Sequence, residues 1–522
     1  MESKRSTGLL DPFCGLVILL RMLPEDKPLC RIGAWTAGAL KMPRSEKLES
    51  GESQAYAGTL LDTFDGHLRR AGKALLQCAG YVALFDLSSG SFQKQAVARG
   101  WTFAGTLPDG AVGRQLMRIS ALRAFLPVAE VVVEQCRVAV LDELEKTVVR
   151  ARATTVRCGE ASAIWLAVMA MRGYAKEYER FVQALVHAGF DAYSGGDYFP
   201  ALGIKRPMYE AKPAVPLDRN APVFESAVLI ARTFIEVARC NEAGMATDLD
   251  TEFLHDYRVS LRRTRSLLSL FRNVVDGEDS CWLKSALAGI MKQTNRLRDL
   301  DVYLLGRAGY YKLVPESMHG GLDIMFDVFV QERQDVFEQV AEFLRGKEYQ
   351  RQIEAVLARL QDLEMGRCGM EPTGRFARRL ILKRYKKAAS LARSIDDGTP
   401  DARVHELRIE CKKMRYLMEF FLPLFPQKKI KPLVKSLKSL QDVLGRFNDY
   451  SVQREALAAF AEAHPMRGRK GIKLAECVGA LVATLYQLQL KARGEVVACL
   501  DGFAGAETQR SFEQMLSNKD SE

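Results

Sequence analysis

Two patterns of hydrophobic and polar residues divide the chain. Up to about residue 205, short apolar runs lie between Gly, Pro and Asp residues, which is typical of strands. These runs are 15–23, 80–90, 129–142 and 146–156, and the last alternates apolar with basic residues. Residues 176–190 instead place apolar residues at helical spacing. From Val223 onward, long segments repeat apolar residues about every 3.6 positions, which predicts helices.

The change between the two patterns predicts a domain boundary. Residues 205–222 hold four prolines in 18 positions and show no periodicity, as expected of a linker. The sequence therefore predicts an α+β domain at 12–205, a linker at 206–222 and an all-α domain at 223–505. A chain of 522 residues is long enough for such domains to bury separate cores.

The composition is that of an ordinary globular protein, with 48% hydrophobic and 27% charged residues. No run reaches the roughly 18 apolar residues that a membrane span needs, so we expect none. Gly15–Leu20 lies between Asp11 and Arg21, which are the wrong flanks for a signal peptide, and is interpreted as a buried strand. The 11 cysteines include no C-x-x-C pair, so we expect reduced thiols, no metal site and a cytoplasmic location.

Positive charge is concentrated in one part of the chain. The net charge is +11, and residues 375–438 alone contain 18 Lys and Arg against 6 Asp and Glu. Such a concentration implies an anionic partner, which can be a nucleic acid, a membrane surface or a polyphosphate.

One segment of the predicted helical domain occurs twice. HDYRVSLRRTRSLLSLF begins at His255 and HELRIECKKMRYLMEFF begins at His405, an offset of 150. The same offset continues into the next helix without a gap, so register is kept over some 48 residues. This indicates a duplication, with copies at about 250–305 and 400–455. The offset pairs Arg258 with Arg408, Arg262 with Lys412, Arg263 with Lys413, Arg265 with Arg415, Arg296 with Arg446 and Asp299 with Asp449.

The repeated helix separates its charges from its apolar residues. Spacings of 3, 4 and 3 residues place four side chains on one stripe: His255, Arg258, Arg262 and Arg265. A second stripe, rotated by about 120°, is apolar and suits a core. Like charges at these spacings repel by about 0.2–0.5 kcal/mol per pair, so the column does not stabilise the helix. We therefore expect an anionic ligand at the basic stripe.

A less specific interpretation exists for each part of the motif. A basic stripe on one helix is ordinarily a solvated surface, but its duplication behind a histidine favours a function. Arg263 and Lys413 lie off the stripe and can equally be surface residues. Asp299 and Asp449 fit a structural role that holds a motif arginine, and either histidine can be a buried hydrogen-bonding residue.

These repeated residues resemble the signature of the CHAD family, the conserved-histidine α-helical domain, over about residues 222–505. The resemblance implies two pseudo-symmetric four-helix bundles, whose basic helices line a channel that binds inorganic polyphosphate. Carried over by position, the binding residues are His255, Arg258, Arg262, Arg265, His405, Arg408, Lys412 and Arg415. Arg263, Lys413, Arg296 and Arg446, with Arg379, Lys383 and Lys386 from the basic segment 374–394, are further candidates.

The first half is similar to the CYTH family, the triphosphate-tunnel fold, on LLDTFDGHLRRAG (60–72) and on residues 171–190. Catalytic members open with E-x-E-x-K, whose glutamates bind a metal. Here VILLR places Val17 and Leu19 at those positions, and ALLQC (74–78) stands where arginines are expected. Without carboxylate ligands a metal-assisted reaction cannot run. The resemblance thus implies a degenerate barrel-like domain that is not catalytic.

Three functions remain as hypotheses. The first is a non-enzymatic polyphosphate-binding protein, associated with polyphosphate granules in the cytoplasm and needing no cofactor. The second is a metal-dependent triphosphatase or phosphohydrolase that uses the first half. The third is a nucleic-acid-binding protein, although the sequence contains no RNP-like segment, zinc finger or aromatic stacking array.

Overall fold

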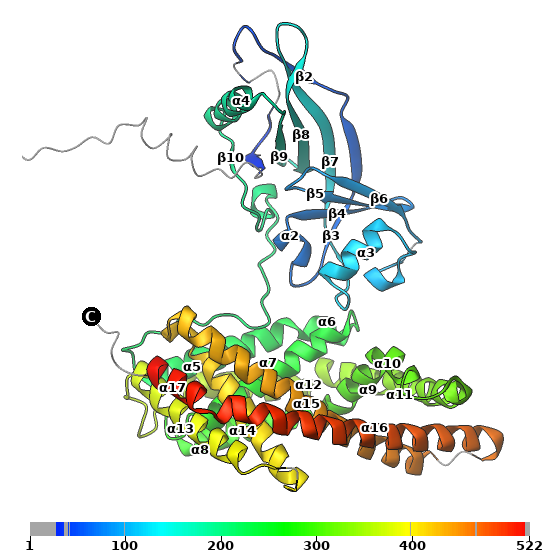
Figure 1. Ribbon diagram of the computed structural model, residues 1–522, viewed down its shortest axis with the longest axis vertical. Coiled ribbons are helices and arrows are strands. Elements are labelled where there is room, and N and C mark those ends of the chain that lie inside the picture. Colours follow the sequence, from blue (N-terminus) through cyan, green and yellow to red (C-terminus); the bar gives the residue numbers. More distant parts are fainter. Residues whose placement is uncertain are drawn as a thin grey trace, which may run out of the picture. The chain divides into compact units, whose positions relative to one another are not determined.

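The protein consists of two compact units, Met1–Glu210 and Ala211–Glu522, each described here by itself (Figure 1). The computed structural model describes residues 28–35, 40, 42–98, 100–396, 398–464 and 467–516. The predicted strand at 15–23 lies outside these residues. The division between the units falls inside the proline-rich stretch at 206–222.

The first unit is built on an antiparallel sheet in the order β10-β1-β9-β8-β7-β3-β4-β5-β6, with β2 also paired to β7. The sequence predictions at 80–90, 129–142 and 146–156 are confirmed as β5, β7 and β8. Among the described strands, β10 and β6 end the path, and no pairing between them closes a barrel. The strands are β1 (Leu29–Ile32), β2 (Lys47–Ser50), β3 (Gln54–Asp62), β4 (Lys73–Cys78), β5 (Tyr81–Asp86), β6 (Phe92–Ala96), β7 (Leu126–Leu141), β8 (Thr147–Cys158), β9 (Ala161–Ala170) and β10 (Asp191–Ala192).

Apolar cores cover both faces of this sheet. On β7, Val131 and Val133 belong to a cluster with Trp165, whereas Val138 and Val140 belong to another. Because alternate residues of a strand point to opposite faces, the two clusters lie on opposite sides. The second cluster is covered by α4 (Ala175–His187), which confirms the helix predicted at 176–190. The other helices are α2 (His67–Arg70) and α3 (Ala111–Ile119).

The segment 60–72 is a strand, a turn and a short helix held together by a buried ion network. The Asp62 carboxylate accepts the backbone N–H groups of Thr63, Leu68 and Arg69 at 2.8, 2.9 and 3.2 Å. The Arg69 guanidinium is only 1% exposed and lies 3.1 Å from Asp197. The charged residues of this segment therefore hold the fold together, since buried charges persist only when they are paired.

The second unit is helical throughout its regular elements, as the 3.6-residue pattern predicts. Local sequence sets the helix starts: the Asp250 side chain, for example, accepts the N–H groups of Glu252 and Phe253 at the start of α7. The helices are α5 (Val223–Cys240), α6 (Glu242–Ala246), α7 (Thr251–Leu270), α8 (Gly277–Gln293), α9 (Asn295–Leu305), α10 (Arg307–Tyr311), α11 (His319–Arg345), α12 (Lys347–Gln361), α13 (Thr373–Arg393), α14 (Asp401–Phe420), α15 (Gln427–Ala463), α16 (Gly468–Ala504) and α17 (Ala506–Leu516).

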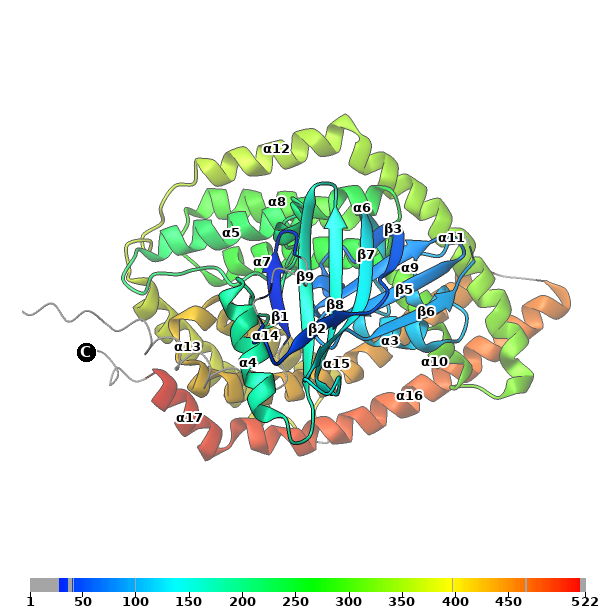
Figure 2. The ribbon, with the colours of Figure 1, turned by 90° about the horizontal axis from the view of Figure 1, so that it is seen from above.

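The duplication extends beyond the motif into the architecture. α5 and α13, α7 and α14, and α8 and α15 begin 150 residues apart, at 223 and 373, 251 and 401, and 277 and 427. The equivalent residues Pro222 and Pro372 form a β-bridge with each other. Phe271 and Phe421, also equivalent, stack with ring centroids 5.3 Å apart and planes 13° apart. In Figure 2, α7 lies between α5 and α14, and it packs against both, so the two copies meet at α7 and α14.

The copies differ in one respect that affects the charged residues. In the first copy the helix breaks at Thr294, between α8 and α9. In the second copy α15 runs on through the equivalent position, Leu444. An interrupted helix leaves backbone carbonyls without intrahelical partners. Side chains near the break can therefore donate hydrogen bonds to these carbonyls, whereas side chains near the unbroken α15 cannot.

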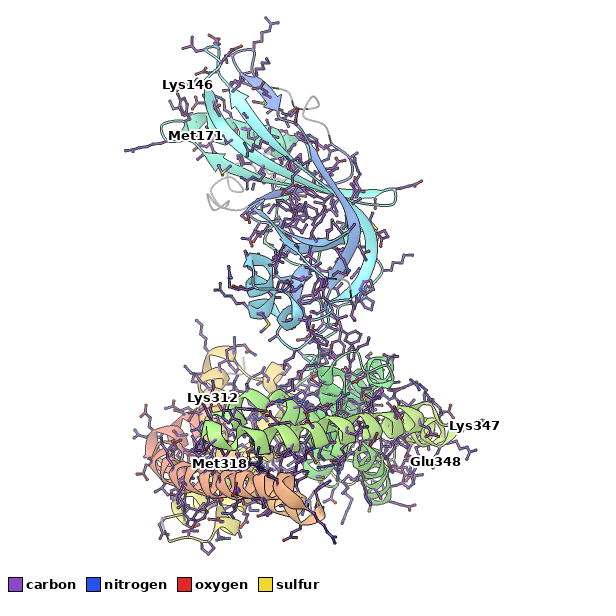
Figure 3. The ribbon with its side chains drawn as sticks, turned by 90° about the vertical axis from the view of Figure 1, so that its right-hand side faces the viewer. Lys146, Met171, Lys312, Met318, Lys347 and Glu348 are labelled. Carbon is purple, nitrogen blue, oxygen red and sulfur yellow. The ribbon has the colours of Figure 1, made fainter. Side chains whose placement is uncertain are left out.

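The long helices combine the two copies in a shared core. α15 and α16 run alongside each other in Figure 1. Figure 3 shows the length of α11 between Met318, which precedes it, and Lys347, which follows it. One apolar cluster joins residues of α9 and α11 to residues of α15 and α16, including Phe326, Phe460 and Leu481.

By length and composition alone, α16 is apolar enough to cross a membrane, with a window of mean hydropathy 1.2 that is 28% buried. The prediction that the chain has no membrane span rested on unbroken apolar runs, which this criterion does not require, and it stays a prediction. The core helix of a soluble protein passes the same test, and Leu474, Cys477 and Leu481 of α16 lie in the shared core.

The stacked rings at the end of both motif helices give a test of this architecture. We expect Phe421→Ala to lower the free energy of unfolding by about 3–5 kcal/mol, because it leaves a cavity against Phe271. Val452→Ala, at a side chain that is 54% exposed, serves as the control and should change it by less than about 0.5 kcal/mol. Urea denaturation followed by circular dichroism measures both. Equal midpoints for the two variants would show that the stack does not hold the copies together.

Candidate functional site

The two copies of the motif face one shared site where α7 packs against α14. An ion pair joins the helices, with Arg263 Nη1 of α7 lying 2.6 Å from Glu419 Oε2 of α14. Arg262 is close enough to Arg408 and Lys412 of α14 that its positive charge lowers the pKa of both. The basic stripes predicted for the two copies are therefore brought together.

Arg258 is held at the break between α8 and α9. Its Nη1 donates to the Met291 carbonyl at 2.9 Å and to Thr294 Oγ1 at 2.6 Å, and its Nη2 donates to Asn295 Oδ1 at 2.8 Å. Burial, with the charge of Arg262 second, lowers the pKa of Arg258 to about 10. Arg258 thus adds positive charge to the site, while most of its donors serve the fold.

The positive charge of Lys412 is also unfavourable at the site. Burial, followed by the charges of Arg408 and Arg262, lowers the pKa of Lys412 to about 8. Arg408 Nη2 lies 3.4 Å from Asp449 Oδ1, a long contact that compensates part of the charge. Neither Lys412 nor Arg262 has a carboxylate within 4.0 Å in the part of the chain that the structure describes. The positive charge at the centre of the site is therefore not neutralised by the protein.

The stripes continue to Arg265 and Arg415. Arg265 Nη1 lies 3.7 Å from Met291 Sδ, and Arg415 Nη1 lies 3.3 Å from Glu419 Oε1. In the described structure, four stripe arginines have a buried Nε without a hydrogen-bond acceptor: Arg258, Arg265, Arg408 and Arg415. The same is true of arginines outside the column, such as Arg69 and Arg493, so the terminal Nη groups and not the Nε groups are the donors that a ligand can use.

Arg298 belongs to the site although the sequence comparison did not select it. Its charge lowers the pKa of both Arg258 and Asp299, so it lies beside them, and its Nη1 is buried without a described partner. The residue equivalent to Arg298 in the second copy is Asn448. A comparison that selects only the charges shared by both copies misses Arg298, because the second copy has an asparagine there. Its place two residues after Arg296 and next to Asp299 was the available signal.

The two histidines occupy different surroundings. His255 is half-buried on α7, whereas His405 is exposed on α14. His405 Nδ1 lies 2.8 Å from Asn448 Oδ1, and because an amide oxygen only accepts, this contact places the proton on Nδ1. The ring of His405 is therefore oriented by α15 and keeps its other nitrogen for a further contact.

The candidates off the stripe are placed in ion pairs. Arg263 is 4% exposed, with its guanidinium 4.5 Å from the Phe234 ring centroid and bound to Glu419. Lys413 Nζ lies 3.0 Å from Glu410 Oε1. The Arg263 side chain cannot reach a ligand without leaving this core, so its placement favours a structural role.

Arg296 and Arg446 lie in exposed ion pairs between long helices. Arg296 Nη2 is 2.5 Å from Glu332 of α11, and Arg446 Nη2 is 2.6 Å from Glu495 of α16. Their charges are compensated locally, unlike those of Lys412. Both side chains are therefore held by carboxylates of the long helices.

The candidates on α13 are not brought to this site. Arg379 and Lys383 line a separate pocket together with Arg272. Lys386 is exposed on the same helix and does not line that pocket. The sequence prediction grouped these residues with the motif because it could not tell which face of the unit each helix occupies.

The first unit contains a hollow of about 600 Å³ that bears on the predicted degenerate domain. It is lined by Arg137, Arg152, Gln135 and Gln54, and Glu52 is the one carboxylate among its described lining residues. The strand with Val17 and Leu19 lies outside the described residues. Within the described ranges, no group of three or more His, Cys, Asp or Glu side chains is placed to hold a metal ion.

Comparisons with known proteins agree with the helical unit. Residues 229–458 match the family model of the CHAD domain, so the chain contains a CHAD domain. The chain is similar to the crystal structure of the CHAD domain from the plant Ricinus communis, at 25% identity and a TM-score of 0.45, over 55% of this chain and 95% of that one. It is also similar to PptA from Streptomyces chartreusis, at 16% identity and a TM-score of 0.38, over 53% and 99%. No protein with a curated description matches the chain.

The unfavourable charge on Lys412 predicts a stability effect opposite to that of most core changes. Because its pKa is lowered to about 8 in the folded protein, the unfolded chain binds more protons between about pH 8 and its ordinary pKa near 10.4. Stability should therefore rise with pH across that window. Lys412→Met should raise the free energy of unfolding at pH 7 by on the order of 1 kcal/mol, after discounting for solvent screening.

Thermal unfolding without ligand at pH 7 and pH 10 measures this effect. The advantage of Lys412→Met should shrink at pH 10, where the wild-type lysine is largely neutral. Lys438→Met, at an exposed lysine of α15, should show no such pH dependence. A destabilised Lys412→Met variant at pH 7 would mean that the charge of Lys412 is compensated in the fold.

Proposed function

We propose that this protein binds inorganic polyphosphate in the shared site between α7 and α14, and that it does so without catalysis. The observation that carries the proposal is that Arg262 and Lys412, which come from different copies of the repeat, lie close together and have no carboxylate within 4.0 Å in the described structure. A CHAD domain is present, and such domains are associated with polyphosphate binding. We place the protein in the cytoplasm, at polyphosphate granules.

The chemistry of the site suits a chain of phosphates. Polyphosphate repeats a charged group at short intervals and has no base to recognise, so a column of cations is sufficient. Arginine can bind phosphate oxygens with two parallel N–H groups, whereas lysine acts as a point charge. The second copy has Lys412 where the first has Arg262, so the two sides of the site contribute differently.

The proposal is one of binding because two carboxylates of the site, Glu419 and Asp449, contact arginines. Glu419 contacts Arg263 and Arg415, and Asp449 contacts Arg408. General-base or metal-binding roles need carboxylates that are free for a reactant or an ion. Release of phosphate from triphosphate by the full chain with Mg²⁺ or Mn²⁺ would instead support the triphosphatase hypothesis.

Removing the two uncompensated cations tests the site. We expect Arg262→Ala/Lys412→Ala to weaken binding of long-chain polyphosphate by about 1.5–3 kcal/mol per side chain, the range for hydrogen bonds to charged groups. Fluorescence anisotropy with labelled polyphosphate at physiological salt measures the change, and wild-type affinity should fall steeply as salt rises.

The matched control is Lys435→Ala/Lys438→Ala, which removes the same charge from the exposed face of α15. If both double variants lose affinity equally, binding follows net charge and the proposed site is wrong. Competition with RNA at equal phosphate concentration separates the alternatives, because a nucleic-acid-binding protein should release polyphosphate to RNA.

Lys412 should also make binding depend on pH. In the free protein its pKa is about 8, and bound phosphate raises it because the anion favours the charged form. Affinity should therefore be constant below about pH 8 and decrease above it, where binding must take up a proton. Lys412→Arg should remove this decrease, since arginine stays charged. Titrations at pH 7, 8, 9 and 10 measure it, and a flat wild-type profile would exclude Lys412 from the ligand contacts.

A further inference from the structure

A second concentration of positive charge lies on α13, apart from the shared site. A pocket of about 380 Å³ is formed by α13, the turn that follows α7 and the segment that precedes α13. Its volume is at the small end of the range of about 300–1,000 Å³ that is usual for small-molecule sites. The described residues that line it include five cations and no carboxylate: Arg272, Arg379, Lys383, Arg384 and Lys387.

The walls of the pocket are fixed by the fold. Asn273 lies in the turn after α7 and adopts a positive φ of 61°. Its backbone carbonyl accepts a hydrogen bond from the Cys368 N–H at 2.7 Å, which anchors the turn. The backbone N–H of Gly366 donates to the Val274 carbonyl at 2.9 Å. Two segments distant in sequence are thus bonded together at the rim, so the pocket does not depend on a mobile loop.

Carboxylates outside the lining hold some of the cations in place. Arg379 Nη2 lies 2.5 Å from Glu371, while Arg384 and Lys387 lie 2.9 and 3.0 Å from the buried Glu410. Arg272 and Lys383 have no carboxylate within 4.0 Å in the described part of the chain. The pocket therefore keeps excess positive charge, with its arginines held in place beforehand.

The internal repeat shows that these charges are not a feature of the fold that both copies share. At an offset of 150, the positions equivalent to Arg384 and Lys387 are Phe234 and Val237, which are 1% and 8% exposed. The remaining cations, Arg272, Arg379 and Lys383, correspond to Leu422, Leu229 and Thr233. The motif cations are kept in both copies, whereas the pocket cations occur in one copy only. The pocket is thus a separate acquisition on the same helical framework.

We propose that this pocket binds a compact ligand with clustered phosphate groups, such as a short oligophosphate or a phosphorylated metabolite. Arg379, Lys383 and Lys387 follow one another at intervals of four residues and span about 12 Å at 1.5 Å per residue. That length suits a few phosphate groups. The proposal is independent of polyphosphate binding in the shared site, because the two sets of cations do not overlap.

Isothermal titration of the full chain with inorganic triphosphate tests the proposal. Arg272→Ala/Lys383→Ala should weaken saturable binding roughly tenfold or more, and it breaks no ion pair with a described residue. Lys435→Ala/Lys438→Ala, at exposed lysines of α15, should leave triphosphate binding unchanged. In the Arg262→Ala/Lys412→Ala background, which removes cations of the shared site, saturable binding of triphosphate to the pocket should remain. A phosphorylated metabolite as the natural ligand would appear as competition with triphosphate.

Two results would overturn the proposal. One is triphosphate binding that the pocket variant retains or that the shared-site variant abolishes. The other is a pocket variant that loses affinity for long-chain polyphosphate while triphosphate never saturates the wild type, because the pocket would then be an extension of the polymer site. If the shared-site variant keeps full polyphosphate affinity, the function proposed above fails and this inference stands.

Discussion

Electrostatic repulsion between two packed basic helices is the constraint on which the rest of the helical unit depends. α7 and α14 bring arginines and lysines of both copies to one interface, where burial makes each charge more costly than in water. The fold offsets this repulsion with a small number of specific contacts. Arg263 and Glu419 join the helices by an ion pair, and the stacked rings of Phe271 and Phe421 hold their ends together. The centre of the interface, at Lys412, is left uncompensated.

The duplication makes the site two-sided without making it symmetric. The helix break at Thr294 gives Arg258 three acceptors, whereas its equivalent Arg408 faces an unbroken α15 and makes only a long contact to Asp449. The first copy adds Arg298 where the second has Asn448, which orients His405. Each copy therefore combines a cation held by the fold with one whose donors remain available to a ligand.

Periodicity and internal repetition predicted the parts of the structure that local sequence determines. The helical half, the strands β5, β7 and β8, and the stripe that carries Arg262 and Lys412 follow from spacing alone. The roles of Arg263, Arg298 and Arg379 could not be predicted, because they depend on which helices pack together. Arg263 lies in a core against Phe234, and Arg379 faces a pocket formed by segments distant in sequence. Counting charges along the sequence groups the shared site with the pocket on α13, although the fold separates the two.

The internal repeat distinguishes the shared site from the pocket on α13 by whether the charges occur in both copies or in one. The charges of the α7 and α14 stripes, which are retained in both copies, lie where these two helices pack, so a ligand can contact both at once. Charges present in one copy lie on α13, where the other copy has Phe234 and Val237 packed in its core. The helical framework accommodates either apolar or cationic residues at these positions, since equivalent helices begin at equivalent residues in both copies. Arg384 and Lys387 pair the buried Glu410. Lys383 is explained by neither helix formation nor core packing, and an anionic ligand accounts for its place beside Arg272 in one pocket.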